Sequence, residues 1–141
     1  MKKFIGAAAI TMGMLGMGAT GANALTQSRS CIAGGSYSAN NNITYTANNG
    51  AWVITKTEYR YGPADANSTH NNMNEYIYNS AGTLLWSYFS PDSLVRDNVL
   101  HTSHTISGGV TVSVSLGSTF RVTNIIDVPG ASDPSCGVVF N

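Results

Sequence analysis

The side chains of this 141-residue chain that could bind a metal or move a proton are few. His101 and His104 are the closest pair, and imidazole is both the commonest metal ligand and the usual proton carrier near neutral pH. On a regular β-strand their odd spacing directs the two rings to opposite faces, so only a β-bulge would bring them together. His70 lies in a separate polar segment with only Asp65 nearby. We therefore expect neither a metal site nor a cofactor.

The nucleophiles and acids match no catalytic motif. No serine lies in the Gly-x-Ser-x-Gly turn of α/β-hydrolases. Glycoside hydrolysis requires a pair of carboxylates, but no motif selects two of the available acids. We therefore expect a protein that is not an enzyme. The acids considered for such a pair are Glu58, Glu75, Asp65, Asp92 and Asp97.

The first 24 residues are typical of a cleaved secretory signal. They begin with two lysines, continue as a weakly apolar run over residues 4–17 and end on Ala22-Asn23-Ala24. That run is shorter than the roughly 20 apolar residues a membrane-spanning helix needs. We expect residues 25–141 to form one secreted domain, in the periplasm or the extracellular medium, with no membrane insertion of the mature chain.

Export to an oxidising compartment predicts a disulfide between Cys31 and Cys136, the only cysteines of the chain. The spacing is wider than that of the inter-sheet bridge of immunoglobulin domains, so the bond would join a first strand to a last one. In the chain-entropy account, closing so long a loop stabilises the fold by about 4 to 5 kcal/mol.

The charge balance argues against nucleic acid as a partner. From Leu25 onward the chain has five basic and seven acidic side chains, a net charge of 5 − 7 = −2. Proteins that bind a phosphate backbone carry clustered lysine and arginine, and this sequence has no such cluster.

Short β-rich runs, separated by glycine, asparagine and serine about every ten residues, predict an all-β fold. We expect a two-layer antiparallel β-sandwich, loosely immunoglobulin-like, with eight or nine strands. Asn49-Gly50 predicts a type I′ turn that pairs Tyr45 with Ile54 and would pair Ile43 with Lys56. A second hairpin is expected between residues 75–79 and 83–89, apolar on both faces and therefore covered on both sides.

The C-terminal half predicts two more hairpins. A loop at residues 107–109 would pair Ile106 with Val110, and a loop at residues 117–119 would pair Leu116 with Phe120. Residues 62–72 and 90–98 are expected to be irregular loops. The apolar face expected from these registers is Leu100, Ile106, Val110, Val112, Val114, Leu116, Phe120, Val122 and Ile126.

Four tyrosines are the candidate ligand-binding residues, because exposed aromatic rings stack on sugars or anchor a protein partner. If the inward parity set by Ile54 continued along its strand, the charged residues 56, 58 and 60 would be buried without partners, which is too costly. Either the strand leaves the core after Thr55 and exposes its two tyrosines, or a β-bulge near Lys56 switches the faces and buries them. The four candidates are Tyr59, Tyr61, Tyr76 and Tyr78.

These observations predict a secreted, non-catalytic binding module whose partner is a protein or a polysaccharide at the cell surface. The aromatic residues also suit a carbohydrate-binding module. A third hypothesis is a secreted inhibitor or toxin that acts through the 62–72 loop, since loops of this length often carry binding residues.

Overall fold

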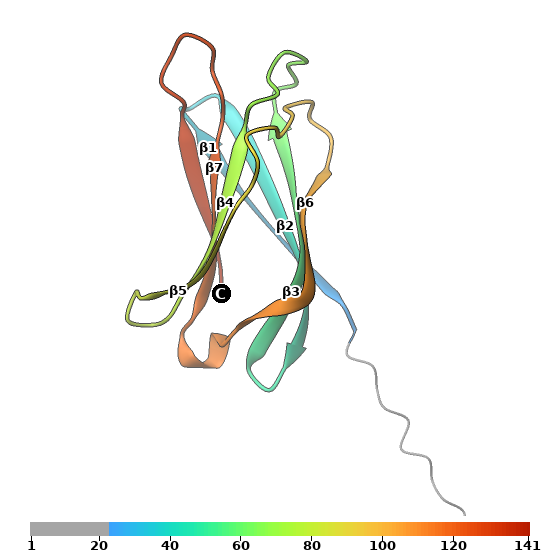
Figure 1. Cartoon of the computed structure of the whole chain (residues 1–141), viewed down its shortest axis with the longest axis vertical. Helices are drawn as coiled ribbons and strands as arrows, with labels where there is room; N and C mark the ends of the chain where they lie inside the picture. The colour runs from blue at the N-terminus through green and yellow to red at the C-terminus, as the bar shows by residue number, and fades with distance from the viewer. Residues whose placement is uncertain (1–22) are drawn as a thin grey trace, which may run out of the picture.

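The computed structural model describes residues 23–141, in which eight strands form two four-stranded antiparallel sheets that face each other (Figure 1). One sheet has the order β1-β2-β3-β6 and the other the order β5-β4-β7-β8. This arrangement confirms the expected two-layer β-sandwich. The expected signal segment lies outside the described residues, apart from its last two. The elements are β1 Leu25–Ala33, β2 Tyr37–Asn48, β3 Ala51–Gly62, β4 Asn72–Tyr78, β5 Leu84–Phe89, β6 His101–Val112, the 3₁₀ turn η1 Val114–Leu116, β7 Thr119–Ile125 and β8 Ser135–Phe140.

The β2–β3 hairpin turns at Asn49-Gly50, as expected. Both residues have positive φ, 46° and 77°, which is the conformation of a type I′ turn. Tyr45 pairs with Ile54, and this part of the predicted register is confirmed.

Past Ile54 the register of β3 shifts by one residue. Tyr45 pairs with Ile54 but Thr44 pairs with Lys56, so Thr55 is an extra residue in β3. This is a β-bulge, and it exchanges the two faces of the strand. The expected pairing of Ile43 with Lys56 is therefore wrong, because the bulge brings Thr57 opposite Ile43.

The β4–β5 hairpin has the predicted parity as far as Ile77, but a register shift then pairs Tyr78 with Leu84, and the hairpin lacks the predicted covering. Ile77 pairs with Trp86 on the inner face, and Tyr76 pairs with Ser87 on the outer face. Strand β5 is an edge strand, and the outer side chain of Phe89 is 62% exposed. The hairpin is thus covered on one side only, because no further layer packs on this face among residues 23–141.

The two C-terminal hairpins predicted from the sequence are not formed. Strand β6 runs on through Gly108 and Gly109 and pairs with β3 on both sides of them, so the two glycines make a bulge within one strand. Both have positive φ, and a Cβ on Gly109 would lie 2.5 Å from Val53 Cγ1. The chain then crosses through η1 to the other sheet, which leaves Leu116 exposed instead of paired with Phe120. The glycine torsions that suggested a turn serve a bulge instead.

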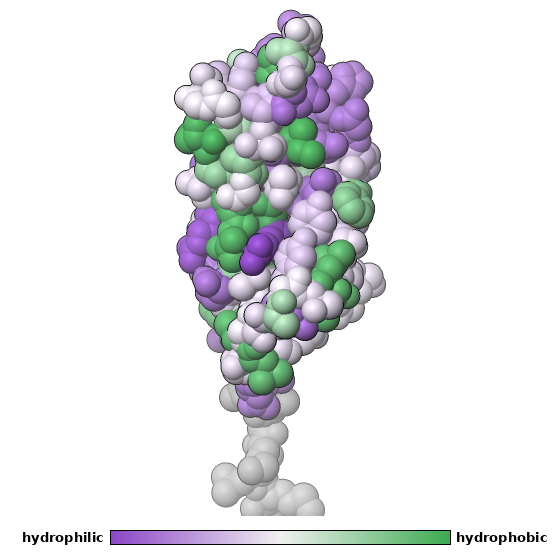
Figure 2. Space-filling view, turned by 90° about the vertical axis from the view of Figure 1, so that its left-hand side faces the viewer, coloured by the Kyte–Doolittle hydropathy of each residue, from purple (hydrophilic) through white to green (hydrophobic). Residues whose placement is uncertain are grey.

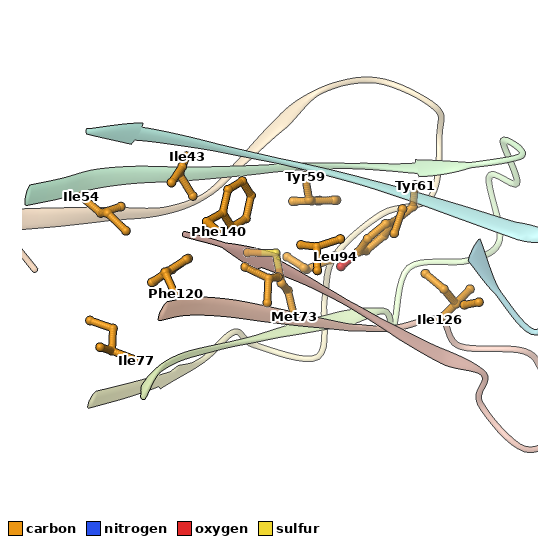
Figure 3. Close-up of a cluster of buried hydrophobic side chains, with 14 of the residues drawn as sticks. Ile43, Ile54, Tyr59, Tyr61, Met73, Ile77, Leu94, Phe120, Ile126 and Phe140 are labelled. Atoms are coloured by element: carbon orange, nitrogen blue, oxygen red, sulfur yellow. The ribbon is translucent and has the colours of Figure 1, made fainter. Parts of the chain in front are cut away.

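The core lies between the two sheets (Figure 3). Four of the nine residues expected on an apolar sheet face are fully buried in it, namely Val112, Phe120, Val122 and Ile126. On one side of the sandwich the edge strands β1 and β8 contact each other, and the disulfide between Cys31 and Cys136 joins them. The predicted disulfide is thus confirmed. On the other side the edge strands are β5 and β6.

The two ends of the sandwich differ in charge. The long loops after β3, β5 and β7 gather at one end (Figure 1). They carry all five aspartates of the chain: Asp65, Asp92, Asp97, Asp127 and Asp133. The turns at residues 49–50, 79–83 and 113–118 hold no charged side chain.

Candidate functional site

A bulge in β6 overturns the expectation that the two neighbouring histidines face opposite ways. His101 pairs with Tyr59 and His104 pairs with Thr57, and the register shifts between them. Both rings therefore lie on the inward side of β6. They have separate partners, since His101 Nε2 is 2.9 Å from Asp97 whereas His104 Nδ1 is 3.5 Å from Glu75 Oε2. Residues 23–141 contain no cluster of three potential metal ligands.

Glu75 is the one acid that the structure buries completely. It lies on the inner face of β4 with 0% of its surface exposed. Its Oε1 accepts a hydrogen bond from the Thr57 hydroxyl, whereas its Oε2 is 3.5 Å from His104 Nδ1 and accepts no hydrogen bond from the described residues. Burial raises the pKa of Glu75 from 4.5 to about 7, although the Thr57 bond acts to lower it. Partial burial lowers the pKa of His104.

Two aromatic rings of β5 pack on the His104 ring. The Tyr88 ring stacks on it with the centroids 3.6 Å apart, and the Trp86 ring lies parallel to it at 6.4 Å. Burial, followed by the charge of Glu75, raises the pKa of Tyr88. Residues 23–141 form no pocket beside this cluster. The arrangement places Glu75 Oε2 and His104 Nδ1 3.5 Å apart, and the stacked rings link β5 of one sheet to β6 of the other.

Tyr59 and Tyr61 are core residues and are not accessible to a ligand. They are 3% and 0% exposed, and their rings contact each other between the sheets (Figure 3). The Tyr61 hydroxyl donates to Asn124 Oδ1 at 3.0 Å, and the Tyr59 hydroxyl accepts from the Val95 N–H at 3.2 Å. The bulge alternative is therefore correct, and these two tyrosines are removed from the candidate site.

Tyr76 and Tyr78 lie on the outer face of the second sheet, half-buried among their neighbours. Tyr76 contacts Phe89 edge-on at 5.9 Å and Tyr78 at 6.0 Å. The Arg121 guanidinium lies over the Tyr78 ring at 4.9 Å. The structure thus brings together two of the four predicted tyrosines and adds Arg121, which the sequence did not indicate.

We call this surface the aromatic face and define it by six residues. Tyr76, Arg121 and Val139 are consecutive in register across β4, β7 and β8. Figure 2 shows this side of the molecule, on which hydrophobic residues lie among pale and strongly hydrophilic ones. The members of the aromatic face are Tyr76, Tyr78, Leu84, Phe89, Arg121 and Val139.

The outer face of the first sheet is of a different kind. Because Thr57 points inward, its neighbours Lys56 and Glu58 point outward, and they form an ion pair at 2.7 Å. Opposite them on β2 are polar residues, including Asn40 and Asn42. This face is mainly polar, although Ile32 of β1 is 59% exposed on it, and the contrast singles out the aromatic face.

The 62–72 loop is held in place by Arg96, whose surface is 5% exposed. Its guanidinium donates to Asp65 Oδ2 at 3.0 Å and to the Pro63 carbonyl at 2.9 Å, and it lies 4.9 Å from the centre of the Tyr37 ring. Ser68 accepts a further bond from Arg96 Nε at 3.2 Å. The loop is thus fixed to the loop after β5, a link that no sequence motif indicated.

No family model, curated protein or solved structure matches this chain. Within residues 23–141 the structure holds no helix with the length and hydropathy to cross a bilayer. The sequence did not indicate the Glu75–His104 pair. Alternation along β4 places Glu75 on the inner face with Ile77, but it does not indicate that His104 of the other sheet lies against it.

Proposed function

We propose that this protein is an exported, non-catalytic module that binds another protein through its aromatic face. The observation that carries the proposal is the difference between the two outer faces. One carries ion-paired and amide side chains, and the other carries two tyrosines, a phenylalanine and an arginine that no further layer of the described chain covers. The disulfide is consistent with export to an oxidising compartment.

The residue types on the aromatic face favour a protein partner. Tyrosine and arginine are over-represented among residues that dominate protein–protein binding energy, and phenylalanine is enriched in the centre of interfaces. Arg121 is the only charged member of the face. A complementary partner would therefore present an apolar centre and a carboxylate near Arg121.

The ring geometry is less suited to a polysaccharide. Stacking on a flat sugar chain requires aromatic rings that lie in one plane. The Tyr76 ring is tilted by 34° from Tyr78 and by 87° from Phe89. Rings tilted in this way fit the irregular surface of a protein partner better than the flat face of a polysaccharide chain.

The 62–72 loop supports a second candidate function, that of an inhibitor. Because Arg96 holds this loop in one conformation, the loop would lose little conformational entropy on binding. His70 is an exposed residue of this loop and provides a variant that tests it.

Photo-crosslinking at the surface of producing cells tests the proposal. The probes are the wild type, a Tyr76→Ser/Phe89→Ser variant of the aromatic face, a Lys56→Ser/Glu58→Ser variant of the opposite face, and His70→Ala. We expect saturable binding of one protein partner. The affinity for this partner should fall about 30-fold or more in Tyr76→Ser/Phe89→Ser and in no other variant, as expected when a binding hot spot is lost.

Three results would contradict this proposal. Equal loss of the partner in the Lys56→Ser/Glu58→Ser variant would show that the aromatic face has no special role. Loss in His70→Ala alone would assign binding to the 62–72 loop. Saturable binding to a glycan array that disappears in Tyr76→Ser/Phe89→Ser would show that the ligand is a carbohydrate.

A further inference from the structure

The two sheets are held together differently along their two pairs of edge strands, β1 with β8 and β5 with β6. On one side a covalent bond joins β1 to β8. On the other, β5 and β6 belong to different sheets, so side chains must hold them together. The contact consists of the stacked rings of Tyr88 and His104, with Glu75 behind them at 3.5 Å from His104 Nδ1.

The charge of this contact depends on one proton. While Glu75 and His104 share a proton, the pair is neutral overall, as an acid beside a neutral imidazole or as a carboxylate beside an imidazolium. When the proton leaves, a carboxylate with 0% exposure remains without a cation. A buried unpaired charge is strongly unfavourable, so the closed contact weakens.

Within residues 23–141, the groups that face Glu75 include no cation other than a protonated His104. Glu75 is faced by Thr57 from β3, by Tyr88 from β5 and by His104 from β6, and its neighbour in register on β7 is Val122. Of these, only Tyr88 and His104 titrate, and Tyr88 becomes an anion when it does. His101, the other histidine on this side of β6, is engaged with Asp97.

We propose that Glu75 and His104 form a proton-dependent clasp that holds β5 against β6, closed while the pair keeps a proton and open once the pair loses it. The clasp comprises Glu75, His104, Tyr88, Trp86 and Thr57. It concerns the fold itself and holds whether or not the aromatic face binds a protein.

The direction of the effect follows from linkage. The pKa of Glu75 is about 7 in the closed form and 4.5 when the side chain is exposed, so closure through Glu75 is strongest below pH 4.5 and is lost as the pH rises through 7. Between pH 5 and pH 8.5 this residue alone increases the opening equilibrium of β5 about 70-fold. His104 acts in the opposite direction, because its lowered pKa favours opening in acid.

Hydrogen exchange of the full chain, corrected for intrinsic rates, tests the clasp at pH 5 and pH 8.5. In the wild type we expect β5 amides to lose protection as the pH rises, relative to amides of β8, the other edge strand of the same sheet. In Glu75→Gln only the His104 effect remains, so β5 protection should stay level or increase. Glu58→Gln, an outward-facing acid on β3, should behave as the wild type.

Two outcomes would overturn the proposal. One is a loss of β5 protection in Glu75→Gln that equals the wild-type loss, since the sensing proton would then lie elsewhere. The other is a wild-type protein whose β5 and β8 amides respond identically to pH. The second comparison needs no variant and decides the question even if Glu75→Gln does not fold.

Discussion

Removing the bond between Cys31 and Cys136 should lower the free energy of unfolding by about 5 kcal/mol. The bond closes a loop of 106 residues, since the two cysteines are 105 positions apart. The chain-entropy relation gives about 16 cal/mol/K for a loop of this length, or about 4.8 kcal/mol at 25 °C. Small domains have about 5 to 15 kcal/mol of stability in total, so the unbridged protein should be marginal.

Urea unfolding of a Cys31→Ala/Cys136→Ala variant measures this loss. The slope of the free energy against urea should also increase, because the unbridged unfolded chain exposes more surface. Wild-type protein with the disulfide reduced is the control, since it lacks the bond but keeps both sulfur atoms, one of which lies 3.7 Å from Asn124 Nδ2. A loss below about 1 kcal/mol with an unchanged slope would refute the entropic argument.

Two further predictions concern residues that no surface function explains. Asn124→Ala should lower the free energy of unfolding by about 3 kcal/mol, because Asn41 and the Tyr61 hydroxyl both lose a buried hydrogen-bond partner. A urea midpoint close to that of the wild type would contradict this prediction. Gly109→Ala should destabilise the fold by about 1 to 3 kcal/mol more than Gly108→Ala. The two glycines have nearly the same φ, 73° and 75°, but only a Cβ on Gly109 would lie against neighbouring atoms. Equal melting temperatures for the two alanine variants would rule out that contact.

The sequence was sufficient for the fold class because local chemistry determines it. The Asn49-Gly50 pair specifies a type I′ turn, and alternating polarity specifies the two faces of a strand. A chain with only two cysteines allows only one disulfide. The same kind of reasoning gave the bulge in β3 as one of two alternatives, because burial of Lys56, Glu58 and Arg60 would be too costly, and the structure decided between them.

Local chemistry was insufficient where the partner strand decides the conformation, as in β6. A positive φ at Gly108 and Gly109 is equally compatible with a hairpin turn and with a bulge, and only the partner strand decides between them. The bulge beside Ser103 likewise placed His104 against Glu75. No alternation within one strand could indicate that contact, because it depends on the packing of two sheets.

The uneven placement of the aspartates gives the described part of the molecule an electric dipole along its long axis. At the loop end Arg96 forms an ion pair with one of the five aspartates, Asp65, and the opposite turns are uncharged. Near an anionic surface the molecule should therefore turn its loops away and approach with its uncharged turns. This alignment should fade as salt rises, because the screening length is only about 8 Å at physiological ionic strength.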